Sequence, residues 1–584
     1  MGNSRSPRLF AAVTAAAMVL ISVPQNISVT AADNNGIILS GGWYEEGFAE
    51  WDSSVIGSSA SVSYKESASS DYVSVDNDLI HGNRVDIPGL KAGTAYDIKI
   101  TGSSGSAECS VTPMAFDRTG YAHWNYTEGV GAYNDDGSLK DGVTVIYVTN
   151  ENKDTITYNK KTGLYSIFAD GKPQNVVFRL IGDIDVPSGA IPNDGSKNDG
   201  SNMLYLEDAV NVTVEGIGTD AHLVRWGIEM KRANSCEVRN LYFYQYPDDA
   251  CSVTGGSTSD QYSRNVWIHN NDFGIGLNEY AGNGTIDADK AEGDGSTDVK
   301  RSEFVTISYN YYEECHKCSL IGPNTSTYQD WITMHHNWFN NTLSRNPRVR
   351  VSHVHVLNNY FVKNAEYGIG ASYNSKLFSE CNYFEGVNLP LDAETIGKDA
   401  YSGTIKSYGD VFEGCTMGEG LAYQTVTDRS AKVSIDNMVS GGDAYDNFDT
   451  DPALIYSGYN TDTAEEARAN CIAYSGRMKN KEYNGSSAPE VPVVTTTTAP
   501  ITTTTTTEEV TTTTTTSPED IRGDINDDGS FTVADLVALN GWLLDPTYEI
   551  AKWKAGDLNN DEHLNIYDLV LLRAELTNNV YILH

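Results

Sequence analysis

The segment from Asp289 to Phe361 concentrates the side chains that are best suited to chemistry. It contains a group of carboxylates, one lysine and a cluster of arginines. In order these are Asp289, Glu292, Asp294 and Asp298, then Lys317, then Arg345, Arg348 and Arg350. Carboxylate oxygens suit a hard cation such as Ca²⁺, and guanidinium groups suit the carboxylates of a ligand. The combination predicts a site for an acidic polymer.

The overall charge restricts the partners of such a site. The chain has 584 residues and a formal charge of −39, which argues against nucleic acid and against an anionic membrane surface. A polyanionic substrate would be repelled as well, unless a local cationic patch or a bound metal overcame the repulsion. The segment described above supplies candidates for both.

The ends of the chain differ in composition from its middle. Residues 1–32 read as a secretory signal peptide, in which Arg5 and Arg8 precede the apolar run Leu9–Val23. The run is short for an uncleaved membrane anchor, so we expect an extracellular protein. Residues 486–519 are rich in threonine and cannot form a core, which indicates an extended linker before a last domain at 520–584.

Two further parts precede the linker. Residues 33–115 contain short strand-like runs separated by Gly, Ser and Asn turns, and GLKAGTAYDIKI resembles the late strands of a fibronectin type III module, with Tyr96 as its corner tyrosine. Residues 116–485 repeat a pattern of β-branched residues, then Asn, any residue and an aromatic. The repeated asparagines are Asn271, Asn310, Asn337, Asn359 and Asn382. A period near 22 residues with one such motif per repeat predicts a parallel β-solenoid in which these amides stack as a ladder.

Eight cysteines are spread along the chain, too sparsely for a disulfide scaffold. Cys315-His316-Lys317-Cys318 looks like half of a zinc site, but no second Cys or His pair follows at finger spacing. We interpret the cysteines as small buried side chains, with room for one or two disulfides.

The last domain contains two segments with oxygen-bearing side chains at the alternate positions of a calcium loop. The predicted ligands are Asp524, Asn526, Asp528, Ser530 and Asp535 in the first loop, and Asp557, Asn559, Asp561, His563 and Asp568 in the second. Asp at position 12 and the paired LVALNG and LVLLRA helices resemble type I dockerin modules. That resemblance implies two structural Ca²⁺ ions and a cohesin partner in a cellulosome; a calcium sensor is the alternative.

Residues 116–480 resemble family 1 of the polysaccharide lyases, the pectate lyases. The resemblance is carried by YPDDACSV, DGSTDVK, TISYNYYEECHKCSLIG, TMHHNWFNNTLSRNPRVR and HVHVLNNYF. It implies a mainly β protein with a right-handed parallel β-helix, a groove for polygalacturonate, and Ca²⁺. A monomer is expected.

The resemblance also assigns roles within the segment. Asp294 and Asp298 match the metal-binding acid pair, and Asp289 is the third expected ligand. Lys317 would pair with a substrate carboxylate, Arg345 would act as the base and Arg350 would bind another carboxylate. A β-elimination needs a cation on the uronate carboxylate because the proton beside it is otherwise hardly acidic.

Some assignments stay open at this point. Arg348 would touch either substrate or a neighbouring acid, and Asp248 and Asp249 would line the coil beside the metal. The family often has Asp in WIDH, where this chain has His269, which would lie in the groove or pack against a turn. His335 and His336 are expected beside the ladder. The alternatives to a pectate lyase are a pectin lyase acting on methyl esters and a non-catalytic pectin-binding protein.

Overall fold

We describe a computed structural model of the chain. It describes residues 36–190, 203–246, 248–274, 276, 294–393, 401–418, 423–434 and 442–478, and scattered positions between 522 and 572. The chain divides into two compact units, residues 1–493 and 494–584. Asp289, Glu292, Asp528, the signal peptide, the linker and the whole of the second calcium loop lie outside the described residues.

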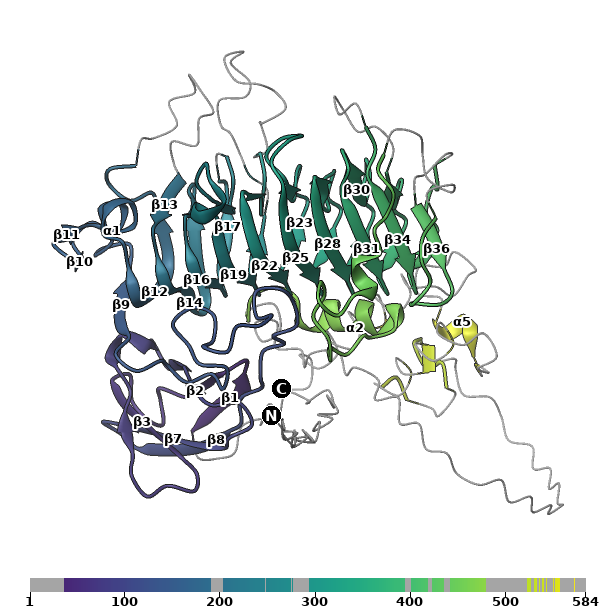
Figure 1. Cartoon of the computed structure of the whole chain (residues 1–584). Helices are drawn as coiled ribbons and strands as arrows, with labels where there is room; N and C mark the ends of the chain where they lie inside the picture. Colours follow the sequence, from purple (N-terminus) through teal and green to yellow (C-terminus); the bar gives the residue numbers. More distant parts are fainter. Residues whose placement is uncertain are drawn as a thin grey trace, which may run out of the picture. The chain divides into compact units, whose positions relative to one another are not determined.

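Most of the first unit is a stack of coils, each with strands in three parallel sheets (Figure 1). The first sheet, which we call the site sheet, has eight strands: β13 (Met203–Glu207), β15 (Gly227–Lys231), β18 (Cys251–Thr254), β21 (Val299–Lys300), β24 (Leu320–Ile321), β27 (Arg348–Arg350), β30 (Ile369–Ser372) and β33 (Leu391–Asp392).

The chain then turns into a second parallel sheet. Its strands are β9 (Thr144–Val148), β12 (Gln174–Asp185), β14 (Val210–Val224), β16 (Asn234–Arg239), β19 (Ser263–His269), β22 (Ser302–Ser308), β25 (Gln329–His335), β28 (Ser352–Leu357), β31 (Lys376–Glu380), β34 (Thr404–Tyr408) and β36 (Tyr423–Val426). The third sheet contains β17 (Tyr242–Tyr244), β20 (Asp272–Phe273), β23 (Tyr311–Glu313), β26 (Trp338–Asn340), β29 (Tyr360–Val362), β32 (Tyr383–Glu385) and β35 (Val411–Glu413).

The parallel solenoid that the sequence predicts is therefore confirmed, because equivalent strands of successive coils pair in parallel. The inward side chains form one continuous core, in which Tyr312, Phe339, Phe361 and Phe384 stack with ring centroids 4.5–4.9 Å apart. Among the described residues the helices are α1 (Leu164–Asp170) and α2 (Ala464–Tyr474) in this unit and α5 (Trp553–Gly556) in the second unit. The remaining short elements of the first unit are β10 (Thr157–Tyr158), β11 (Lys161–Thr162), η2 (Ser259–Gln261) and η6 (Phe448–Thr450).

The asparagine ladder is also confirmed. Each amide Nδ2 donates to the Oδ1 of the next rung, from Asn271 through Asn310, Asn337 and Asn359 to Asn382, at 2.9–3.1 Å. The same Oδ1 atoms accept the backbone N–H of the preceding rung at 2.8–3.1 Å. All five side chains are buried, and their mutual bonds satisfy polar groups that would otherwise be costly to bury.

Residues 37–111 form two antiparallel four-stranded sheets, as expected for a strand-rich module. One contains β1 (Ile37–Trp43), β2 (Glu46–Trp51), β6 (Arg84–Pro88) and β5 (Ile80–His81); the other contains β4 (Val73–Ser74), β3 (Ala60–Glu66), β7 (Tyr96–Gly102) and β8 (Ser106–Val111), and η1 (Asn77–Leu79) precedes β5. The Tyr96 hydroxyl accepts the backbone N–H of Lys91 at 3.0 Å, as a corner tyrosine would. The fibronectin assignment itself stays a prediction.

In the second unit, the described residues form a small apolar cluster of Ile525, Ala538, Leu539 and Leu572. The carboxylate of Asp535 accepts backbone N–H groups from Ile525, Asn526 and Thr532 at 2.8–3.1 Å. The dockerin assignment and its calcium ions stay predictions. Within the part of the chain that the structure describes, no helix is long and apolar enough to cross a membrane.

The ladder ends in a carboxylate rather than a sixth amide. Asp410 accepts the N–H and Nδ2 of Asn382 at 2.8 and 3.1 Å, and the hydroxyls of Ser379 and Ser407 at 2.6 and 2.7 Å. Removal from water raises the pKa of Asp410 to about 6, although these donors oppose the shift. Its contribution to stability is therefore fully present only below the unfolded-state pKa, and is lost as pH rises through about 6.

We expect Asp410→Asn to stabilise the β-helix at pH 7.5 and to weaken its gain in stability on going to pH 5. The amide keeps the acceptor for Asn382 without a buried charge, and the change should be on the order of 1–2 kcal/mol. Thermal unfolding at both pH values tests this. Asp141→Asn, at an exposed position, makes the same change of charge as a control. An unchanged pH dependence in Asp410→Asn would contradict the prediction.

Candidate active site

A group of carboxylates gathers at the edge of the site sheet where β18 and β21 begin. Asp248, Asp249 and Asp294 each offer an oxygen within 4.8 Å of the others. Asp298 lies beside them and is buried, with its Oδ1 accepting the Leu320 N–H at 2.8 Å. The chain segments carrying these acids are neighbours because Asp249 and Gly295 form a parallel β-bridge. We call these four residues the carboxylate group.

A glycine allows this close approach. A Cβ atom on Gly295 would lie 2.5 Å from Asp298 Oδ1 and 3.0 Å from Asp249 Oδ1, which is too close for a real side chain. Glycine therefore leaves space between two oxygens that face each other across it. Lys300, two residues after Asp298 on the same strand face, donates to the other oxygens of Asp249 and Asp298 at 3.0 and 3.1 Å.

The electrostatics of the group suit a cation. Burial and the neighbouring charges of Asp298 and Asp248 raise the pKa of Asp249 well above its ordinary value, although Lys300 opposes the shift. Lys300, together with Lys317 at 3.1 Å from Asp294, supplies two positive charges against four acids. A donor set made only of carboxylate oxygens, with space kept open at Gly295, fits Ca²⁺ better than a softer metal.

Lys317 lies next to the carboxylate group on the following coil. Its Nζ is 3.1 Å from Asp294 Oδ1, and its side chain is only 6% exposed. Two buried cysteines flank it, and Cys315 lies close enough to the Tyr246 hydroxyl for an O–H···S contact of 3.9 Å. Five of the eight cysteines are buried as predicted, whereas Cys109, Cys381 and Cys415 are half-buried. All eight are free thiols, so the one or two disulfides that the sequence allowed are not formed, and among the described residues no cysteine belongs to a cluster that could hold a metal. Cys315 and Cys318 pack in the core on either side of the turn that presents the lysine.

The arginines occupy the next coil. Lys317 forms a β-bridge with Ser344, which places it beside the residue preceding Arg345. Arg345 has a left-handed backbone, with φ of +61°, and is half-buried. Arg348 and Arg350 lie on one face of β27, with Val349 buried between them. Burial raises the pKa of Tyr367 to about 12, and the charges of Arg348 and Arg345 oppose that rise, so both guanidinium groups lie near this ring.

The placement of His269 corrects one prediction. It is fully buried at the end of β19 in the second sheet, away from the site sheet. Its ring stacks on Trp267 with centroids 3.6 Å apart, and its Nε2 lies 2.9 Å from Glu237 Oε1. Such a side chain cannot line a substrate groove. The departure from WIDH therefore does not concern the carboxylate group.

Other predicted residues are placed as follows. His336 stacks on Tyr309 at 4.7 Å and lies 3.0 Å from His335, beside the ladder as expected. Asp248 and Asp249, predicted only to line the neighbouring coil, belong to the carboxylate group itself. Sequence reasoning also missed Lys300, although its position two residues after Asp298 on a strand was a usable signal.

Comparison with known proteins identifies the family of the chain. A family model described as "Pectate lyase" matches residues 108–480, well over half of the chain. The chain belongs to the pectate lyase family. Its N-terminal module before residue 108 and its C-terminal unit lie outside the match.

Individual pectate lyases show the same likeness at lower coverage. A pectate trisaccharide-lyase of Bacillus licheniformis is 34% identical over 201 residues, which covers 34% of this chain and 54% of the relative. A pectate lyase of Bacillus subtilis is 29% identical over 244 residues, covering 38% and 58%. The chain thus spans little more than half the length of these relatives.

Among solved structures, a pectate lyase of Bacillus sp. N165 in complex with trigalacturonate aligns with a TM-score of 0.45 and 23% identity, covering 62% of this chain and 99% of that one. At these values the family assignment depends on the family model and not on the superposition.

We expect Asp249→Asn to raise the Ca²⁺ concentration needed for half-maximal binding by about tenfold or more, equivalent to about 1.4 kcal/mol. The substitution removes a charge from the centre of the carboxylate group while keeping its size. Calcium titration followed by calorimetry measures the effect, and Asp141→Asn is the surface control. Unchanged affinity in Asp249→Asn would show that the ion binds elsewhere.

Proposed function

We propose that this chain is a secreted pectate lyase that cleaves de-esterified homogalacturonan by calcium-assisted β-elimination. The observation that carries the proposal is the order of charges along the site sheet. The carboxylate group, Lys317 and Arg345 lie on neighbouring coils, joined by the bridges Asp249–Gly295 and Lys317–Ser344. A polyuronate crossing these coils would meet first a cation held by acids and then two cationic side chains.

The residues divide the reaction between them. Ca²⁺, when held by Asp249, Asp294 and Asp298, would neutralise the uronate carboxylate and stabilise the negative charge that develops next to it. Lys317 would bind the same or a neighbouring carboxylate, and Arg350 would bind another through its planar guanidinium. These contacts hold one sugar with its C5 proton towards the next coil.

Arg345 is the proposed base. It removes the proton from C5, the electron pair forms the C4–C5 double bond, and the bond from C4 to the glycosidic oxygen breaks. The departing oxygen takes up a proton and becomes the hydroxyl of the released chain. The products are a 4,5-unsaturated uronate at the new non-reducing end and an ordinary reducing end. The first step requires the guanidine in its neutral form.

The C-terminal unit supports a second part of the proposal. The calcium-loop spacing, together with Asp535 binding three backbone N–H groups across the first loop, supports a dockerin that attaches the enzyme to a cohesin. We expect residues 486–584 to co-migrate with at least one of a panel of cohesins in the presence of Ca²⁺. Co-migration should be lost when a chelator is added. Cohesin binding without Ca²⁺, or none at all, would contradict this assignment.

We expect Arg345→Ala to lower the rate of unsaturated-uronate formation from polygalacturonate by ~10²–10⁴-fold, the usual contribution of a general base. Ultraviolet absorbance of the product, with Ca²⁺ and with chelator, is the measurement. Arg225→Ala removes an arginine from a surface ion pair with Asp185 and serves as the control.

The alternatives predict different outcomes. A rate of product formation that is unaffected by chelator and higher on methylated pectin would indicate a pectin lyase. Retardation on pectate gels without any unsaturated product from the unaltered protein would indicate a binding protein.

A further inference from the structure

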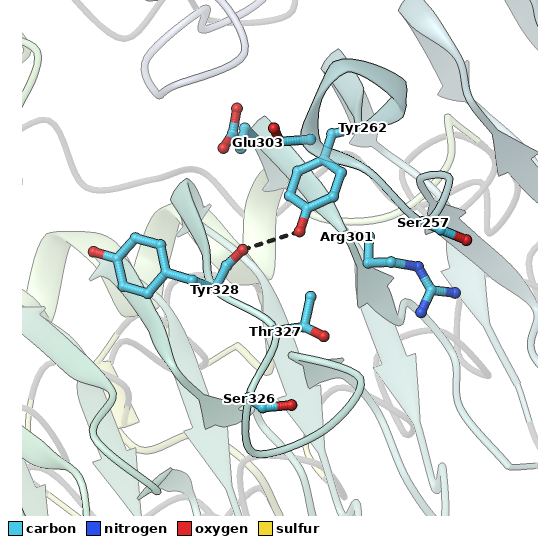
Figure 2. Close-up of a pocket in the computed structure, with 8 residues that line it drawn as sticks. Ser257, Tyr262, Arg301, Glu303, Ser326, Thr327 and Tyr328 are labelled. Atoms are coloured by element: carbon cyan, nitrogen blue, oxygen red, sulfur yellow. Dashed lines mark hydrogen bonds between the residues drawn. The ribbon is translucent and has the colours of Figure 1, made fainter.

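Three successive turns between the site sheet and the second sheet line an open pocket of about 540 Å³, which we call the turn pocket. The turn after β18 contributes Ser257, Ser259 and Tyr262; Arg301 forms the turn after β21, and Glu303 follows it in β22. The turn after β24 contributes Ser326, Thr327 and Tyr328. Figure 2 shows the Arg301 side chain between the first and third of these turns. None of these residues belongs to the carboxylate group or to the arginine cluster.

Arg301 is held in place without being neutralised. Its backbone N–H donates to Gln329 Oε1 at 2.6 Å, and its Nε donates to the Gly255 carbonyl at 3.2 Å. Among the described residues, no carboxylate forms an ion pair with it. The one acid that lines the turn pocket, Glu303, is already paired with Arg264 at 2.9 Å.

That lack of a partner is informative in this chain. The sequence has 79 acidic residues and 40 lysines and arginines, so an arginine has acids in excess to pair with. Arg232, Arg239 and Arg477 illustrate the rule, each with a carboxylate within 2.9 Å. A guanidinium left facing a cavity without such a partner is suited to a carboxylate brought by a ligand.

The other lining groups suit a sugar. Tyr262 donates its hydroxyl to the Tyr328 carbonyl at 3.2 Å, which joins the first and third turns (Figure 2). The Tyr328 side chain is 55% exposed and offers an apolar ring face with a polar edge. Hydroxyl groups of Ser257, Ser259 and Thr327 supply both donors and acceptors, as sugar hydroxyls require.

The pocket also begins where the carboxylate group ends. Arg301 directly follows Lys300, whose Nζ binds both Asp249 and Asp298. Gln329, which fixes the Arg301 backbone, is the first residue of β25 on the next coil and donates to the Val299 carbonyl at 3.1 Å. A polymer bound at the carboxylate group is therefore within reach of the pocket.

We propose that the turn pocket is an accessory uronate-binding site in which Arg301 binds a sugar carboxylate, Tyr328 packs against the pyranose ring and the hydroxyls bind its edge. The identity of the polymer rests on the proposed function. The uronate comes either from the chain already held at the carboxylate group or from a second chain, and length dependence separates the two sources.

The test measures binding in the Arg345→Ala background, in which cleavage is expected to be slow enough for the oligomers to stay intact during a titration. Calorimetric titrations with galacturonate oligomers of increasing length, and gel retardation on polygalacturonate, are compared for Arg301→Gln, Arg301→Lys and the surface control Arg225→Gln. We expect Arg301→Gln to weaken binding to long oligomers and polymer by about tenfold, the loss of one charge-assisted contact. Arg301→Lys should recover part of the loss, and Arg225→Gln should bind like the parent.

Length decides the source of the uronate. If one chain spans both sites, trigalacturonate binds equally to the parent and to Arg301→Gln, and the difference appears only in longer oligomers. If a second chain occupies the pocket, trigalacturonate binds the parent at two sites and Arg301→Gln at one. Equal binding by Arg301→Gln and Arg225→Gln at every length would overturn the proposal.

A kinetic comparison in the active protein separates this proposal from the proposed function. Arg301→Gln should raise KM on polygalacturonate by about the same factor as the loss of binding and leave kcat unchanged, since the pocket does not contact the reacting atoms. Absence of unsaturated product from the parent, together with weakened binding by Arg301→Gln, would disprove the lyase and retain the pocket. If the parent forms product and Arg301→Gln has unaltered KM and unaltered binding, the lyase is retained and the accessory site in the turn pocket is disproved.

Discussion

The register between successive coils is the constraint on which the rest of the structure depends. Each rung of the asparagine ladder bonds the backbone and side chain of the rung before it, so one coil cannot slide past the next without breaking buried hydrogen bonds. Side chains from positions more than 20 residues apart in sequence are thereby fixed as neighbours. Asp249 beside Gly295 and Lys317 beside Ser344 are consequences of that register.

Two features of the sequence were sufficient to predict this framework. The recurring Asn and aromatic positions identified both the ladder and the stacked rings, because a solenoid repeats its inward and turn positions once per coil. Arg345, Arg348 and Arg350 were recognisable as a group because they are close in sequence. Asp410 was missed as the end of the ladder since a carboxylate interrupts the pattern that identified the other rungs.

The carboxylate group was harder to predict because it is assembled across coils. Asp294 and Asp298 are close in sequence, whereas Asp249 precedes Asp294 by 45 residues and is brought beside it by the bridge to Gly295. His269 shows the opposite error. His269 precedes the ladder residue Asn271 by two positions, and residues just before a ladder asparagine belong to the second sheet. Lys317 and Arg345 instead follow the ladder residues Asn310 and Asn337, in the part of each coil that leads into the site sheet. Position relative to the ladder would have excluded His269 from the groove.

Because acidic residues are in large excess, a cationic side chain without an acidic partner is more informative here than in a protein of balanced charge. Buried arginines such as Arg239 are enclosed by Glu215 and Glu237, and the cost of burying each charge is offset locally. Within the described residues, neither Arg345 nor Arg301 forms an ion pair with an acid. Arg301 directly follows β21 on the coil that carries Asp294 and Asp298, and Arg345 lies two coils further on, just before β27. In a chain that repels its own substrate, such positions are where attraction for a polyuronate has to be concentrated, since screening in solution limits the reach of each charge to about 8–10 Å.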